Sequence, residues 1–172
     1  MQKVILLTGP GGAGKTTVSK LLANRNGYVY LDGDREDSAF FPSGNQWLPE
    51  NTEQLKKAHE KILKKTKDLV DQGKNVVIDY IIFGHYQEFI ESLKQEFGDD
   101  LRILVLFPSQ NILRKRDKNR ECWTTGAERI AAVYEEFQAL KSIIGARSFV
   151  DTTDQTPEET LAMVIGRQLE GE

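Results

Sequence analysis

The sequence predicts a parallel α/β fold in which five short strands alternate with helices that cover both faces of one sheet. Short apolar runs recur along the chain, and segments with the periodicity of an amphipathic helix separate them. A glycine-rich run follows the first apolar run, and acidic residues end the next two. With 172 residues, the chain has the length of one domain, which we expect to span residues 1–172.

The composition is that of a globular protein. Apolar residues make up 39% of the chain and charged residues 28%, and the formal net charge of −3 disfavours bulk nucleic-acid binding. The single cysteine, Cys122, cannot form an internal disulfide, which is typical of a reducing compartment. No apolar run approaches the length of a membrane span, and no signal peptide is recognisable. We therefore expect a cytoplasmic monomer or homodimer with no membrane partner.

The first predicted strand, residues 4–7, leads into a glycine-rich turn and then into a helix. Residues 9–16 read GPGGAGKT and match the pattern G-x-x-x-x-G-K-[ST]. Glycines let consecutive backbone N–H groups converge, and the start of the helix adds its positive dipole end, so this turn forms a nest for phosphate oxygens. Lys15 would reach the β- and γ-phosphates, and the Thr16 hydroxyl would bind Mg²⁺. The expected nucleotide-binding residues of this run are Gly9, Gly11, Gly12, Ala13, Gly14, Lys15, Thr16 and Thr17.

Two other interpretations of this run are a flexible glycine turn with an ordinary surface lysine and a dinucleotide-binding turn. The second arises because Gly9, Gly11 and Gly14 also fit G-x-G-x-x-G, and acidic residues follow the next strand. The sequence Gly14-Lys15-Thr16 favours a nucleoside triphosphate, which requires a cation and a metal-binding hydroxyl at this point.

The second predicted strand, residues 28–31, ends in Asp32-Gly33-Asp34. Carboxylates just past the carboxyl end of a parallel strand face the ligand crevice of an open sheet. We expect one carboxylate to hold a Mg²⁺-bound water and the other to orient or deprotonate an acceptor hydroxyl. Asp32 is assigned to the metal and Asp34 to the acceptor, and the alternative is an ordinary polar turn.

An acceptor-binding region is expected at about residues 35–72. Residues 35–49 read as irregular, and their aromatic side chains suit either part of an acceptor pocket or a small satellite core. A strongly amphipathic helix is predicted at residues 51–72, where Asn51 and Gln54 resemble a capping box.

The third predicted strand, residues 75–79, ends with Asp79 at the same edge of the sheet. A carboxylate at this point is where proteins with this kind of phosphate loop place the acid that positions the Mg²⁺ shell. The alternative is a strand-end cap. Beyond it, residues 86–97 predict a helix and residues 101–107 a strand, and Ser109 is expected to cap the next helix.

Residues 114–120 form the most charged stretch of the chain. Arg116 and Arg120 share one helix face, from which two guanidinium groups could grip a triphosphate and balance the charge on a transferred phosphoryl group. A solvated basic helix or a polyanion-binding patch is the alternative. Residues 122–126 predict a short mobile segment.

The rest of the chain predicts a helix, a fifth strand at residues 147–151 and a last helix. The last helix begins with the capping box Thr156-Pro157-Glu158-Glu159. The preceding helix carries the apolar stripe Ile130, Val133, Tyr134, Phe137 and Leu140.

The chain resembles the small P-loop kinases in the order of its motifs. These are the phosphate loop, the Asp32-Gly33-Asp34 turn, the strand end at Asp79, and Arg116 with Arg120. The small P-loop kinases include the adenylate, shikimate, gluconate and adenylylsulfate kinases and chloramphenicol phosphotransferase. The resemblance implies a three-layer α/β/α P-loop NTPase fold, a five-stranded sheet of order 2-3-1-4-5 and ATP with Mg²⁺ as the donor. It also implies a small lid at about residues 116–126, with Arg116 against the adenine or the lid phosphates and Arg120 reaching the transferred phosphoryl group.

Departures from the family patterns bear on the acceptor. The sequence lacks the Asp-Arg-x-Pro-Trp-Leu stretch of gluconate kinases, the triple glycine of shikimate kinases and the Asp-Gly-Phe-Pro-Arg of nucleoside-monophosphate kinases. The best fit is therefore to the gluconate-kinase-like and chloramphenicol-phosphotransferase-like proteins.

We accordingly expect an ATP-dependent phosphotransferase that acts on a hydroxyl group of a small molecule. Lys15, Asp34 and Arg120 are the expected catalytic residues, and the expected metal site consists of Thr16, Asp32 and Asp79. The alternatives are a non-enzymatic nucleotide-binding switch and a 5′-hydroxyl nucleic-acid or nucleoside kinase, of which the nucleic-acid form is disfavoured by the acidic net charge.

Overall fold

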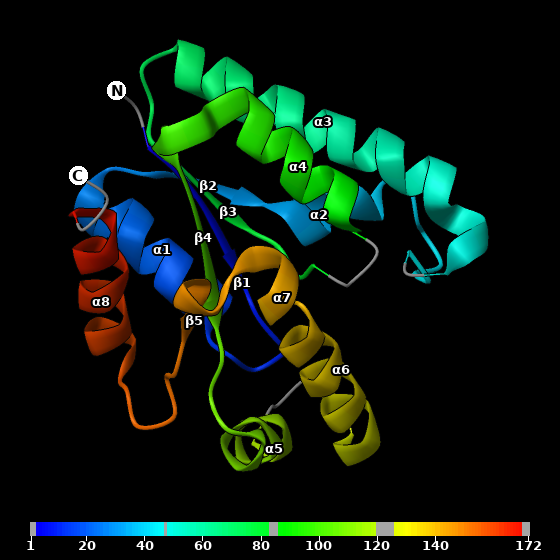
Figure 1. The fold of residues 1–172 in the computed structure, drawn as a ribbon, viewed down its shortest axis with the longest axis vertical. Coiled ribbons are helices and arrows are strands. Elements are labelled where there is room, and N and C mark those ends of the chain that lie inside the picture. Colours follow the sequence, from blue (N-terminus) through cyan, green and yellow to red (C-terminus); the bar gives the residue numbers. More distant parts are fainter. Residues whose placement is uncertain (1–2, 47, 83–85, 120–125, 170–172) are drawn as a thin grey trace.

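A five-stranded parallel sheet forms the centre of the molecule (Figure 1). The computed structural model describes residues 3–46, 48–82, 86–119 and 126–169. Within them the strand order is β2-β3-β1-β4-β5, which confirms the predicted order. The strands are β1 (Val4–Thr8), β2 (Val29–Asp32), β3 (Val76–Asp79), β4 (Leu101–Leu106) and β5 (Phe149–Val150).

The central strand, β1, delivers the glycine-rich loop between its two neighbours. It pairs with β3 through Leu7 opposite Asp79, and with β4 through Thr8 opposite Val105. The edge strand β2 pairs with β3 so that Asp32 lies opposite Asp79. This register brings two carboxylates to the same edge of the sheet as the loop.

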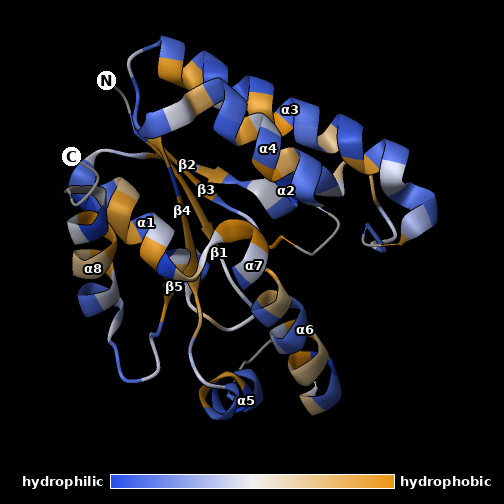
Figure 2. Ribbon diagram, viewed as in Figure 1, coloured by the Kyte–Doolittle hydropathy of each residue, from blue (hydrophilic) through white to orange (hydrophobic). Residues whose placement is uncertain are grey.

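The strands are apolar along nearly their whole length because helices cover both faces of the sheet (Figure 2). Alternate residues point to opposite faces. Val4 and Leu6 join the cluster that includes buried residues of α3 (Thr52–Asp71) and α4 (Gln87–Phe97). Ile5 and Leu7 join the cluster that includes α1 (Lys15–Asn26) and α8 (Pro157–Leu169).

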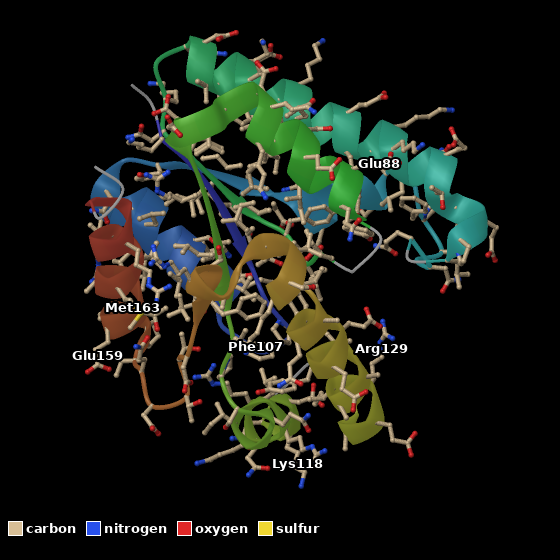
Figure 3. The ribbon with its side chains drawn as sticks, in the orientation of Figure 1. Glu88, Phe107, Lys118, Arg129, Glu159 and Met163 are labelled. Carbon is tan, nitrogen blue, oxygen red and sulfur yellow. The ribbon has the colours of Figure 1, made fainter. Side chains whose placement is uncertain are left out.

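Of the remaining helices, α5 and α6 lie beyond the carboxyl end of β4 (Figure 1). Phe107 directly follows β4 (Figure 3). Its ring stacks on Tyr134 of α6 at 4.3 Å between centroids. This contact fixes α6 beside the sheet, with α5 packed against it. The elements are α2 (Gly33–Ser38), α5 (Gln110–Lys118), α6 (Ala127–Ala139), α7 (Lys141–Ile144) and the 3₁₀ turns Pro49–Asn51, Gly98–Asp100 and Ala146–Ser148.

Three local predictions were wrong in part. Residues 33–38 form the helix α2, where an Asp-Gly-Asp turn and an irregular segment were expected. The side chain of Asn51 does not cap α3, and its Nδ2 instead donates to the carbonyl oxygen of Asn45 at 2.8 Å. The fifth strand is only two residues long.

Two predicted helix caps are confirmed. Ser109 accepts a hydrogen bond from the backbone N–H of Ile112 at the start of α5. At the start of α8, Thr156 N donates to Glu159 Oε2 at 2.8 Å, and Glu159 N donates to Thr156 Oγ1 at 3.2 Å, which is a reciprocal capping box. No helix within the described residues combines the length and the apolar character needed to span a membrane.

Candidate active site

The glycine-rich loop between β1 and α1 depends on backbone conformations that favour glycine. Gly9, Gly12 and Gly14 have φ angles of +145°, +85° and +100°. A Cβ atom on Gly9 would lie 2.3 Å from the carbonyl oxygen of Leu106 at the end of β4. The loop therefore begins in direct contact with the neighbouring strand, which leaves no room for a side chain there.

Lys15, the first residue of α1, folds back over this loop. Its Nζ donates to the carbonyl oxygens of Gly9 at 2.8 Å and Pro10 at 3.1 Å, and the residue is buried. The ammonium group thus lies against the loop, with the amides of the helix start beside it. A positive group and helix N-terminal amides together make a site for an anion.

Thr16 and Asp79 are joined across the sheet edge. Thr16 Oγ1 donates to Asp79 Oδ2 at 2.7 Å, and Tyr30 of β2 donates its hydroxyl to the same oxygen at 3.1 Å. Asp79 is only 3% exposed, and its Oδ1 is buried without a hydrogen-bond partner among the described residues. A buried carboxylate oxygen normally has a partner, so this atom marks a place where a further donor or a metal-bound water fits.

The donor set at this edge suits Mg²⁺. Mg²⁺ usually takes one or two protein groups and fills the rest of its octahedron with waters and phosphate oxygens. A hydroxyl, Thr16, and a carboxylate with one free oxygen, Asp79, supply such a set. Over the described ranges of the chain there is no cluster of three His, Cys, Asp or Glu residues that would hold a metal ion without a nucleotide.

Asp32, the third predicted metal ligand, is partly committed to another role. Its Oδ1 accepts a hydrogen bond of 3.0 Å from the backbone N–H of Arg35, so it caps α2. The register places Asp32 opposite Asp79, and it keeps one oxygen outside the cap. The structure therefore brings Asp32 to the site edge while using half of its carboxylate to begin a helix.

A pocket of about 740 Å³ opens beside the loop. Its lining includes residues 11–18, and Asp34 and Arg116 join them from α2 and α5. Of the predicted nucleotide-binding residues, only Gly9 lies outside the lining, because it packs beneath the loop. The lining on the side of α8, which the sequence analysis missed, consists of Thr152, Gln155, Pro157 and Thr160. The rule that ligands bind past the carboxyl ends of strands could have found the first of these, since it follows β5.

Asp34 reaches the solvent of this pocket from the first turn of α2. The pKa of its carboxyl group is raised to about 7, chiefly because the surrounding protein disfavours the charged form, with Lys15 opposing the shift. The carboxylates of Asp37, Asp79 and Asp32 raise the pKa further. A carboxylate with this pKa at the mouth of a phosphate site can accept a proton near neutral pH.

Arg116 crosses from α5 to the glycine-rich loop. Its Nη1 donates to the carbonyl oxygens of Gly12 at 3.1 Å and Ala13 at 3.3 Å. Asp117, the next residue, accepts a 3.1 Å hydrogen bond from the N–H of Gly126. This contact joins the two described ends of the predicted lid, residues 116–126. Arg120 and the predicted mobile segment up to residue 125 lie outside the described residues.

A buried polar network behind α2 was also missed by the sequence analysis. The Tyr80 hydroxyl donates to Asp37 Oδ2 at 2.7 Å, and His59 Nε2 lies 3.2 Å from the same hydroxyl. Gln46 Nε2 approaches Asp37 Oδ1 at 3.5 Å. The ring of Tyr80 packs so closely beneath Gly33 that a Cβ there would lie 2.5 Å from Cγ. We call Asp37, Gln46, His59 and Tyr80 the Asp37 network, and it sets the position of the helix that carries Asp34.

The comparisons with known proteins agree with this geometry. Residues 4–142 match the family model described as an AAA domain. A guanylate kinase of Prochlorococcus marinus is 24% identical over 186 aligned positions that cover 96% of both chains.

Solved structures share the fold. A sugar kinase from Janibacter superposes with a TM-score of 0.76 at 17% identity, covering 99% of this chain and 95% of the other. The shikimate kinase of Acinetobacter baumannii gives a TM-score of 0.64 at 22% identity, covering 99% and 94%. The chain therefore belongs to the AAA domain family, and it has the fold of the small P-loop kinases.

Proposed function

We propose that this protein is an ATP-dependent kinase that transfers the γ-phosphoryl group to a hydroxyl group of a small molecule. The observation that carries the proposal is a single pocket edge at which three features meet. These are the glycine-rich loop with Lys15, the Thr16–Asp79 hydrogen bond of 2.7 Å and the Asp34 carboxylate. A binding module for a nucleotide needs the first two features, whereas an acceptor-side carboxylate with a raised pKa serves phosphoryl transfer.

The donor side is held by the loop and α1. Backbone N–H groups of residues 11–16 cradle the phosphates, and Lys15 exchanges its contacts with the Gly9 and Pro10 carbonyls for phosphate oxygens. Thr16 and Asp79, with Asp32 through water, would hold Mg²⁺, which neutralises charge on the β- and γ-phosphates. Arg116 fixes the loop through the Gly12 and Ala13 carbonyls and borders the nucleotide.

The acceptor side is assigned to Asp34. The acceptor oxygen forms a bond to the γ-phosphorus as the bond from that phosphorus to the β–γ bridging oxygen breaks, and ADP leaves. Asp34 accepts the hydrogen bond of the acceptor hydroxyl and takes its proton. Because the transition state is loose, orientation by Asp34 contributes more than strong base catalysis. Arg120 is assigned the role of balancing the negative charge on the transferred phosphoryl group.

A second candidate is phosphorylation of a nucleotide. It is favoured by the relative named guanylate kinase, with which the chain aligns over 96% of its length. The first candidate keeps priority because Asp79-Tyr80-Ile81-Ile82 stands where nucleoside-monophosphate kinases carry Asp-Gly-Phe-Pro-Arg. The non-enzymatic switch remains the rival from another class.

An acceptor screen tests the proposal. ATP consumption by the purified protein with Mg²⁺ is measured across sugars, sugar acids, nucleosides, nucleoside monophosphates, and aminoglycoside- and phenicol-type antibiotics. Lys15→Ala serves as the inactive control, so any signal that it retains is background. Acceptor-dependent ADP formation with a hydroxyl compound supports the kinase, and formation only with monophosphates selects the second candidate. ATP that stays bound and intact for hours with every acceptor would establish the switch, and absence of purine triphosphate binding would overturn the kinase assignment.

A further inference from the structure

The Asp79 carboxylate is satisfied on one side only. Its Oδ2 accepts two hydrogen bonds, from Thr16 at 2.7 Å and from Tyr30 at 3.1 Å. Its Oδ1 is buried and has no partner among the residues that the structure describes. Two donors that converge on the same oxygen from different elements hold the carboxylate in one orientation.

Tyr30 reaches Asp79 because of the register of the two strands. Tyr30 lies opposite Val77, and Asp32 lies opposite Asp79, so Tyr30, Asp32 and Asp79 share one face of the sheet. The phenol ring extends along this face by the length of two residues to place its hydroxyl at Asp79. On α1, Lys20 Nζ lies 5.9 Å from the centre of the ring, which covers the ring from the side of the helix.

The two hydroxyl donors to Asp79 Oδ2, those of Tyr30 and Thr16, play different parts. Thr16 can donate its proton to Asp79 and still offer a lone pair to a metal ion, so Thr16 serves both partners while Tyr30 serves only the carboxylate.

We propose that Tyr30 is a positioning residue for Mg²⁺: by donating to Asp79 Oδ2 beside Thr16, it turns the free Oδ1 toward the water shell of the metal. This inference rests on the proposed function, because it takes the nucleotide-bound Mg²⁺ as the ion that the site holds. It assigns Tyr30 no contact with the nucleotide or with the acceptor. Removal of the Tyr30 hydroxyl should therefore change only the affinity for the metal ion.

Tyr30→Phe tests the proposal, since it keeps the ring and removes the hydroxyl. The readout is the dissociation constant of Mg²⁺, and of Mn²⁺ by paramagnetic resonance, in the complex with a fluorescent ADP analogue. No acceptor is needed. We expect the metal to bind about tenfold more weakly in the variant, while the affinity for metal-free ADP stays within twofold of wild type. Tyr134→Phe is the matched control, because its ring stacks on Phe107 away from the pocket.

A double-mutant cycle with Asp79→Asn identifies the path of the effect. If Tyr30 acts through Asp79, adding Tyr30→Phe to Asp79→Asn produces little further loss of metal affinity. Equal metal affinity in Tyr30→Phe and wild type overturns the proposal, as does full additivity of the two losses. An equal loss for metal-free ADP also overturns it, because it would reveal a role in shaping the loop.

The outcomes separate this inference from the proposed function. If the screen finds no acceptor but Tyr30→Phe still weakens metal binding about tenfold, the acceptor assignment is refuted and the role of Tyr30 is kept. A wild-type protein that binds no metal–nucleotide complex would refute both.

Discussion

The Tyr80 hydroxyl donates a 2.7 Å hydrogen bond to Asp37, which ties the strand that ends at Asp79 to the helix that carries Asp34. Both residues are buried, at 0% and 1% exposure. The contact therefore joins the proposed metal side of the site to its proposed acceptor side, and neither residue lines the pocket.

The first prediction concerns the pH dependence of stability. Burial raises the pKa of Asp37 to about 6 from 3.8, although Tyr80 and Gln46 donate to it. Between these values the folded state holds a proton that the unfolded state releases, so this group lowers the free energy of unfolding as pH rises from about 4 to about 6. In Asp37→Asn this loss is absent, and the variant is expected to be more stable than wild type at pH 7 by about 1–3 kcal/mol.

Urea unfolding at a series of pH values measures this difference. Below pH 3.8, where both states of wild type are protonated at this position, the two proteins should converge. Parallel pH profiles of the two proteins from pH 4 to 7 would contradict the assignment.

The second prediction concerns Tyr80→Phe. The variant keeps the ring beneath Gly33 but leaves Asp37 Oδ2 without its donor, and loss of a buried hydrogen bond to a charged group costs about 1–3 kcal/mol. We expect the free energy of unfolding at pH 7 to fall by that amount. We also expect the backbone amides of α2 to exchange their hydrogens with solvent faster than in wild type. The amides of β3 should keep their protection. Unchanged exchange in α2 would show that the Asp37 network does not hold this helix.

The third prediction uses two glycines that differ in their surroundings. Gly9→Ala places a Cβ against the backbone of Leu106, and we expect it to destabilise the protein by about 2–4 kcal/mol and to abolish nucleotide binding. Gly27 has a φ of +71°, and a Cβ atom there would meet no other atom. Gly27→Ala is therefore expected to cost only the free energy of a left-handed backbone, about 1–2 kcal/mol. Denaturant midpoints and ADP binding measure both, and equal effects would refute the steric argument.

The fourth prediction separates the donor side from the acceptor side. Lys15→Ala is expected to weaken ATP binding and turnover together, because the ammonium group leaves the loop. Asp34→Asn should cost less than Lys15→Ala, lowering turnover by about a hundredfold, the lower end of the range for a positioned proton acceptor, with ATP affinity near that of wild type. Isothermal titration with ATP and single-turnover rates measure the two terms. Full activity of Asp34→Asn would remove Asp34 from the mechanism.

The fifth prediction concerns Arg120. Arg120→Ala should lower turnover with little effect on ATP affinity, because its assigned charge partner develops during transfer. Arg116→Ala is the comparison, since Arg116 already contacts the loop carbonyls in the structure and is expected to weaken nucleotide binding itself. A large loss of ATP affinity with unchanged turnover in Arg120→Ala would contradict its role.

Elements with strong periodicity could be predicted from the sequence. The buried strands and the amphipathic α3 follow from apolar spacing, and the loop from its glycines and Lys15, because these signals are local. The helix α2 was missed because its sequence, GDREDS, is short and polar and carries no apolar stripe. Its helical form depends instead on Asp32 as the cap and on packing against α3.

Contacts between distant residues could not be read from local patterns. Asp37 and Tyr80 are 43 residues apart, and Tyr30 and Asp79 are 49 apart. The alternation of β2 does place Tyr30 and Asp32 on one face, so the side of the sheet that Tyr30 occupies was available from the sequence. The partner that its hydroxyl would find depended on the register with β3, which periodicity does not supply.

The strand order has a consequence for how this protein could diverge. The glycine-rich loop follows the middle strand, β1, which has a neighbouring strand on each side. Asp34 instead follows β2, at the edge of the sheet. Changes in β2, α2 and the segment after them leave the pairs of β1 with β3 and β4 intact. Under the proposed function, substitutions at this margin of the sheet would change the choice of acceptor and leave the ATP site unaltered.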